Sequence, residues 1–346
     1  MRDREVLEPA TGPMVAGAEG AGGVMRLPRR ILESQIGPFI GVGSVLVILL
    51  VVEAFVQSNF YNASNLTNLG RTLGVPLVLA AGMTLALLTG GVDLSIGSSL
   101  ALSGTLYAKL YTGGTPPLLA LVICLAFGLV VGFAINGFLI GRLNMSFFVV
   151  TLGTLSLFRG VVYLWTNSET ISMYDDDLTQ KIGNDTTLGG HVPIALLIAV
   201  ATVVAIYLML RLTTFGRQIY AVGGNREAAR LSGVRTDWVI AAVYAITGLC
   251  AALAAIMTIG RTASVDPNMG ESLELNAAAA VLLGGVSLSG GSGSIWGAVL
   301  GVVFLEVLAN ALALAGTSTS WQLIVTGVIL IVAVYLDRLR ARAHQG

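Results

Sequence analysis

Residues 117–140 read PLLALVICLAFGLVVGFAINGFLI, an apolar run of 24 residues without a charged side chain. An untilted helix crosses the hydrocarbon core of a bilayer with about 20 such residues. Apart from Asn136, the run offers no polar side chain that could face water on one side of a helix. The run therefore predicts a helix that spans a membrane.

The rest of the chain repeats this pattern. Of its 346 residues, 55% are hydrophobic and only 11% are charged, against about 25% in a typical soluble domain. Short polar breaks separate the apolar runs, so the sequence predicts an all-α integral membrane protein of about ten transmembrane helices. The ten predicted spans are 36–56, 70–89, 96–111, 117–140, 146–165, 193–211, 237–260, 274–288, 296–315 and 320–336.

The distribution of basic residues predicts an orientation. Placing both termini in the cytoplasm puts 14 of the 19 Lys and Arg residues on the inner side, as cytoplasmic loops of membrane proteins prefer. The longest outer segment, 166–192, is acidic. We expect residues 1–35 to be a disordered cytoplasmic tail, 36–338 the transmembrane domain and 339–346 a second cytoplasmic tail. The net charge of zero gives no indication of nucleic-acid binding.

Several catalytic motifs are missing from the sequence. The only lysines, Lys109 and Lys181, do not follow a glycine, so the chain contains no GxxxxGK[ST] phosphate-binding loop. GxSxG and HExxH are absent too, and no His or Cys residues have the spacing of metal ligands. We expect a protein that is not an enzyme, with no cofactor and no metal, and if ATP drives it, another chain must hydrolyse the ATP.

The inner segment 212–236, TTFGRQIYAVGGNREAARLSGVRTD, is the largest hydrophilic insertion between inner span ends. Asn225 can cap a short helix and Gly233 can end it. Within this helix the small Ala228 and Ala229 would let a partner approach closely, and Leu231 would offer an apolar contact. By periodicity alone, an ordinary basic loop is the favoured alternative.

Glycine patterns add two expectations. The spacing of Gly128, Gly132, Gly137 and Gly141 within one predicted span is typical of closely packed membrane helices. The stretches 87–95 and 282–289, LLTGGVDLS and LLGGVSLS, are similar to each other and both follow Ala-rich apolar spans. They are either an internal repeat beside a translocation path or two similar turns.

The sequence resembles the permeases of bacterial ABC importers of the ribose/xylose type. Glu227-Ala228-Ala229, three residues and then a glycine match the core of their coupling loop. The similarity extends in order and spacing over about 36–338, and the N-terminal tail alone has no counterpart. The other matching motifs are AAGMT from Ala80, GGVDLSIGS from Gly90, TLGT from Thr151, RGV from Arg159, TN from Thr166, GRQIYAVGGN from Gly216 and GGVSLSGGSG from Gly284.

This resemblance implies a permease of the bacterial inner membrane that works with partners. It implies a pair of permease copies, here a homodimer, two cytoplasmic ABC ATPase subunits on the coupling helices, and an extracytoplasmic binding protein that delivers a sugar. The coupling loop would then contain Arg217, Glu227, Ala228, Ala229, Arg230, Leu231 and Gly233. Branched-chain amino acids are the alternative substrate in the same class, and the GGVDLS run favours a sugar.

Polar residues at membrane depth are the remaining candidates. An ionisable group there is costly and indicates function by default. Asp93 and Ser95 could bond sugar hydroxyl groups, or Asp93 could cap the third span. Asn276 is a further path candidate by resemblance, whereas Glu306 lies outside the matching motifs and could bond another helix or a dimer mate. A proton-coupled secondary transporter using Asp93 and Glu306, or a membrane protein without transport, are the competing hypotheses.

Overall fold

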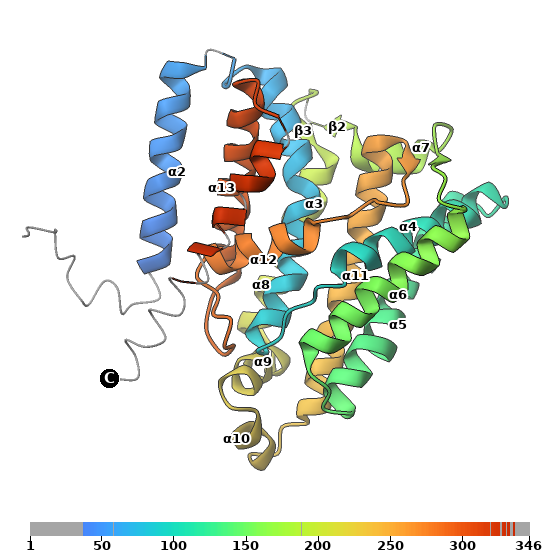
Figure 1. The fold of residues 1–346 in the computed structure, drawn as a ribbon, viewed down its shortest axis with the longest axis vertical. Helices are drawn as coiled ribbons and strands as arrows, with labels where there is room; N and C mark the ends of the chain where they lie inside the picture. The colour runs from blue at the N-terminus through green and yellow to red at the C-terminus, as the bar shows by residue number, and fades with distance from the viewer. Residues whose placement is uncertain are drawn as a thin grey trace, which may run out of the picture.

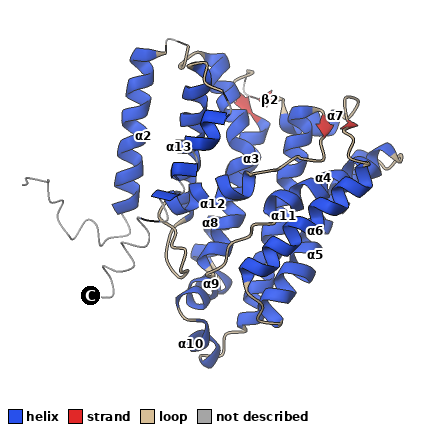
Figure 2. Cartoon of the chain, in the orientation of Figure 1, coloured by secondary structure: helices blue, strands red, loops and turns tan. Residues whose placement is uncertain are grey.

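The computed structural model describes residues 37–57, 59–187, 189–318, 320–325, 327–329, 331–332 and 335, with side chains from residue 41 onward. The predicted tails 1–35 and 339–346 lie outside the described residues. Helices dominate the described part of the chain, and four two-residue strands form the only sheets there (Figure 2). The prediction of an all-α membrane fold is confirmed.

The helices follow one another with short connections (Figure 1). Their bounds are α2 (Gly37–Val56), α3 (Ala63–Leu88), α4 (Ile96–Thr112), α5 (Pro117–Val131), the π-helix η1 (Gly132–Arg142), α6 (Phe147–Thr166), α7 (Asp177–Gly183), α8 (Ile194–Leu212), α9 (Thr214–Gly224), α10 (Arg226–Leu231), α11 (Thr236–Thr262), α12 (Leu273–Leu283) and α13 (Ile295–Leu314). A further helical stretch runs over Ser320–Ile329. The strands are β1 (Ile171–Ser172), β2 (Thr186–Thr187), β3 (Val192–Pro193) and β4 (Ser264–Val265).

Each of the ten predicted spans overlaps a helix, and the first and the last of them lie partly outside the described residues. Within the described part, six helices are long and apolar enough to cross a membrane by themselves. They are Ala63–Leu88, Pro117–Arg142, Phe147–Thr166, Ile194–Leu212, Thr236–Thr262 and Ile295–Leu314. Stretches 41–56, 273–283 and 320–329 are shorter apolar helices. The count of ten transmembrane helices therefore stays a prediction.

Two long helices form the centre of the molecule. The apolar windows of α3 and α11 are 78% buried, whereas that of Pro117–Arg142 is 22% buried and presents an apolar outer surface. In Figure 1, α2 and α13 lie on one flank of this centre, and α4, α5 and α6 lie on the other. The central helices are thus shielded by their neighbours, while the outer ones expose the apolar side chains that lipid tolerates.

The predicted glycine stripe lies where α5 and η1 meet α11. A Cβ on Gly128 would lie 2.5 Å from the carbonyl oxygen of Gly248, and one on Gly132 would lie 2.2 Å from that of Tyr244. Gly137 and Gly141 meet the backbone of Ala241 and Asp237 at similar distances. The predicted close packing is confirmed, because no larger side chain fits along this line.

Irregular backbone precedes α4 and follows α12. With 11 residues, α12 is about 16 Å long, too short to cross a bilayer. The prediction of 274–288 for this span was wrong at its C-terminal end, because Gly284 ends the helix and Gly285 adopts φ +87°. Residues 89–95 before α4 are buried or half-buried, as exposed irregular backbone is not tolerated in lipid.

Candidate functional site

The short helix α10 lies at the end of the molecule opposite α7 and the strands (Figure 1). Asn225 caps it by accepting the backbone N–H of Ala228 at 2.9 Å, and Gly233 follows it with φ +86°. Both features are those expected from the sequence. Charged side chains join α10 to the neighbouring helix ends, because Asp237 lies 3.4 Å from Arg142 and 3.8 Å from Arg226.

The outer face of α10 is open to a partner. Leu231 is 79% exposed, and Ala228 is exposed beside it. Arg230 donates a hydrogen bond of 2.8 Å to Glu227, which raises the pKa of Arg230 above its ordinary value. Of the two alanines expected to face a partner, Ala229 is only 6% exposed, so it packs α10 onto its own chain instead. One side of so short a helix must be buried to hold it in place, and the membership of Ala229 in the coupling loop stays a prediction.

Arg217 lies on α9, one helix before α10. Its side chain is exposed and makes no ion pair with any residue that the structure describes. A cavity of about 410 Å³ beside α10 is lined by Arg226, Glu227, Arg230 and Asp237, among others. The face around α10 thus carries both basic and acidic groups next to one apolar side chain, a composition suited to a protein partner.

Helix α9 contacts the point where the two similar glycine turns meet. The N–H of Gly291 donates a hydrogen bond of 2.9 Å to the carbonyl of Leu88, and the Tyr220 hydroxyl donates one of 3.1 Å to the carbonyl of Gly293. A Cβ on Gly223 would lie 1.9 Å from the same Leu88 oxygen. We call this contact of Leu88, Gly90, Gly223, Gly290 and Gly291 the glycine junction.

The two turns in this junction share one backbone pattern. After α3, Gly90 has φ +80° and the N–H of Gly91 bonds the carbonyl of Ala86; after α12, Gly285 has φ +87° and Val286 bonds Val281. Both helices therefore end in the same Schellman motif. The similar stretches 87–95 and 282–289 therefore form turns of the same geometry. In this geometry Gly90 corresponds to Gly285, which is offset by one residue from an alignment of the shared Gly-Gly-Val letters.

The first two path candidates, Asp93 and Ser95, are buried together. Asp93 is 2% exposed and accepts hydrogen bonds from the Ser95 hydroxyl at 2.6 Å and the Ser95 N–H at 2.9 Å. The Asn136 amide of η1 donates to the Ser95 hydroxyl oxygen at 2.8 Å. Asp93 thus stabilises the turn before α4, where Ser95 is the N-cap residue. Asn136 also belongs to this hydrogen-bonded network but was not among the predicted site residues. Its position as the single amide in the apolar run 117–140 was the signal that could have identified it.

Replacing Ser95 with alanine is expected to destabilise the protein by about 1–3 kcal/mol, because a buried donor and a buried acceptor lose a partner. Ser98→Ala is the matched control, since Ser98 is equally buried but bonds only the carbonyl of Ser95 in its own helix. Thermal unfolding of the purified variants in detergent measures both. Equal melting temperatures for the two variants would contradict the role given to the Asp93–Ser95–Asn136 network.

The third path candidate, Asn276, lies elsewhere. It belongs to the first turn of α12 and lines a cavity that neither Asp93 nor Ser95 lines. Helices α4 and α12 meet near their N-terminal ends, where a Cβ on Gly97 would lie 2.3 Å from the Glu274 carboxylate. The structure therefore does not bring the three path candidates into one site, and their role in a path stays a prediction.

The loop before α12 is fixed by Arg159 of α6. Its guanidinium donates hydrogen bonds to the carbonyl of Pro267 at 2.6 Å and to that of Met269 at 3.0 Å. On the other side of the loop, β4 pairs with β1 in the register Ile171 to Val265. The sequence motif that begins at Arg159 thus positions the start of α12.

Arg159→Gln is expected to destabilise the chain by about 1.5–3 kcal/mol, because two carbonyl groups lose a charged donor at a partly buried site. Arg71→Gln is the control, since Arg71 also donates to a loop carbonyl, that of Asn184, but in an exposed position. We expect less than about 1 kcal/mol there. Thermal unfolding compares the two, and an Arg71 effect as large as that of Arg159 would contradict this account.

The described residues hold no group of three or more His, Cys, Asp or Glu side chains arranged for a metal ion. Cys124 and Cys250 are both buried and free.

Comparison with known proteins identifies the family of the chain. The family model described as "Branched-chain amino acid transport system / permease component" matches residues 65–334. The ribose import permease of Bacillus subtilis strain 168 is 39% identical over 308 residues, which cover 89% of this chain and 94% of that protein. The ribose import permease of Escherichia coli K12 is 38% identical, covering 84% of this chain and 91% of the relative. The galactose/methyl galactoside import permease of the same strain is 34% identical, covering 87% and 94%.

No solved structure matches the chain. The matches extend over most of its helices, including α9, α10 and both glycine turns. The chain therefore belongs to the family of branched-chain amino acid transport system permease components, in which it is similar to the ribose and galactose import permeases, and it is a multi-pass inner-membrane protein.

Proposed function

We propose that this chain is the permease subunit of an ABC importer that moves a monosaccharide such as ribose into the cytoplasm. It is not itself catalytic, and separate ATPase subunits supply the energy. The observation that carries the proposal is α10, an exposed helix with the Glu-Ala-Ala…Gly sequence, in a chain 39% identical to a ribose import permease.

In the proposed mechanism, the path through the permease has two states, each open to one side of the membrane. The ATPase subunits bind the face of α10 through Leu231, Ala228 and the Glu227–Arg230 pair, with Arg217 beside it. When ATP binding closes the ATPases, their motion shifts α10 and α9, and the glycine junction passes this shift to the ends of α3 and α12. The ATPases thus bias which side of the permease is open.

The remaining assembly is part of the same proposal. Ten helices cross the membrane with both termini in the cytoplasm, which places α10 on the cytoplasmic side. Two copies form a homodimer, and an extracytoplasmic binding protein delivers the sugar to the face that carries α7 and the strands. The acidic 166–192 segment contributes to that face, where Asp176 caps α7 and accepts the Tyr107 hydroxyl at 2.7 Å.

Uptake of labelled solutes tests the substrate class. Cells that express the chain with its ATPase and binding protein should accumulate ribose, and a strain without the permease should not. The family description names branched-chain amino acids, so leucine is the second solute to test. Permease-dependent accumulation of leucine without any accumulation of ribose, fructose or galactose would overturn the sugar assignment.

A further inference from the structure

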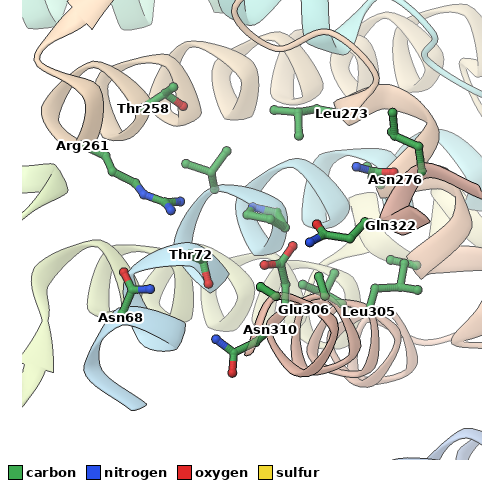
Figure 3. A pocket seen from close by; sticks show the side chains of 18 of the residues that line it. Asn68, Thr72, Thr258, Arg261, Leu273, Asn276, Leu305, Glu306, Asn310 and Gln322 are labelled. Carbon is green, nitrogen blue, oxygen red and sulfur yellow. The ribbon is translucent and has the colours of Figure 1, made fainter. Parts of the chain in front are cut away.

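A cavity of about 690 Å³ lies between α3, α11, α12, α13 and the helical stretch from Ser320. Figure 3 shows its polar side chains, with Arg261 at one side, Asn276 and Gln322 at the other, and Glu306 between them. Pockets that hold small molecules have volumes of about 300–1,000 Å³, so the cavity can hold a sugar ring and several water molecules.

Glu306 is the most unusual member of this lining. It occupies the middle of α13, an apolar helix, where an ionised side chain is costly in a membrane. Among the described residues it has no partner within ion-pair distance. Its neighbours in the cavity are the Thr72 hydroxyl and, at longer range, the Arg261 guanidinium. A carboxylate kept there without an ion pair has hydrogen-bonding capacity left for a ligand.

Of the other polar side chains in the lining, some are already hydrogen-bonded within the protein and others are not. The Asn310 amide already exchanges two hydrogen bonds of 3.0 Å with Asn65. By contrast, the side chains of Asn276, Gln322 and Arg261 make no hydrogen bond to any residue in the described part of the chain. The available groups therefore include a carboxylate and two amides, which together accept and donate bonds as hydroxyl groups require.

The charges of the cavity lining favour a neutral ligand. Among the lining residues that the structure describes, Glu306 is the only acidic and Arg261 the only basic one, so their charges cancel. A polyol needs hydrogen-bond acceptors and donors, which Glu306, Asn276 and Gln322 supply. Asp93 is a poorer candidate, because it is buried, already bonded to Ser95, and absent from this cavity.

We propose that this cavity is a hydroxyl-binding site on the path of the sugar, and that Glu306 is a specificity-determining residue in it, assisted by Asn276 and Gln322. The inference rests on the proposed function, and it adds a site that the coupling surface does not include. Because Glu306 lies on α13 and Asn276 on α12, a shift of α12 through the glycine junction would change the distance between them. The site would then hold the sugar in one state and release it in the other.

The test uses the full chain reconstituted with its ATPase and binding protein in liposomes, with labelled ribose as the probe. We expect Glu306→Leu to lower ribose uptake at least tenfold, and Glu306→Gln, which keeps the shape and one acceptor, to lower it less. Arg71→Gln, at an arginine outside the cavity, should change uptake less than twofold. ATPase binding and the melting temperature of Glu306→Gln should equal those of the wild type.

A second pair of variants tests the volume of the cavity without changing its hydrogen bonds. Ala309 lines the cavity, and Ala309→Phe should fill it and lower uptake at least tenfold; Ala205→Phe, on an exposed face of α8, should not. Uptake at the wild-type rate in both Glu306→Leu and Ala309→Phe would overturn this proposal while the proposed function stands. Absence of ribose uptake in the wild type would instead count against the proposed function. Equal losses of ribose uptake in Glu306→Leu and Arg71→Gln would also overturn the proposal, because Arg71 does not line the cavity.

Discussion

Replacing Gly223 with alanine is expected to lower solute uptake at least tenfold, whereas the same change at Gly224 is expected to be tolerated. The reason is the backbone around Gly223. A Cβ there would lie 1.9 Å from the carbonyl oxygen of Leu88 and 2.5 Å from the nitrogen of Gly291. These two atoms form the hydrogen bond that joins the two glycine turns. The added carbon must therefore separate α9 from the junction or break that bond.

Gly224 makes the comparison a matched one. It is the next residue, in the same helix, and a Cβ on it would have no heavy atom within 4 Å. Both substitutions remove the same backbone freedom of a glycine, so a difference between them reports the contact alone. Uptake at equal expression and the melting temperature of the purified protein measure the effect. Normal uptake by the Gly223 variant would show that the glycine junction does not transmit motion.

Leu231→Asp is expected to remove ATPase binding without destabilising the isolated permease. The side chain is 79% exposed, so the permease alone loses no packing. An apolar anchor at the centre of an interface contributes about 2 kcal/mol or more, and its loss would weaken the affinity about 30-fold. Co-purification with the ATPase and binding affinity in detergent measure the change.

Tyr174→Asp is the control for this variant. Tyr174 is a large side chain, 72% exposed, in the segment before α7 at the opposite end of the molecule. It should leave ATPase binding unchanged. If the Leu231 variant binds the ATPase as the wild type does, α10 is not the docking helix.

Much of this fold can be predicted from the sequence, because lipid demands long apolar helices whose ends carry caps and charges. The helix over 117–142 and the cap at Asn225 follow from residue type alone. Helix α3 begins at Ala63, earlier than predicted, because its polar first turn, capped by Asn62, carries no hydropathy signal.

What the sequence does not predict is which distant segments meet. The bond from Gly291 to Leu88 joins turns about two hundred residues apart, and no local pattern specifies that distance. Similarly, the apolar context of Glu306 shows that the residue is unusual, but its cavity forms only when α3, α11, α12 and α13 pack together. The burial of Ala229 depends on the tertiary packing of α10 in the same way.

The most direct test of the account is transport by the purified chain in liposomes, with and without the ATPase subunits. With ATPase, binding protein and ATP present, the account predicts that ribose accumulates inside against its gradient. Without the ATPase, it predicts no accumulation, even under an imposed proton gradient. Uphill transport by the chain alone would contradict the central claim that its energy comes from partners bound at α10.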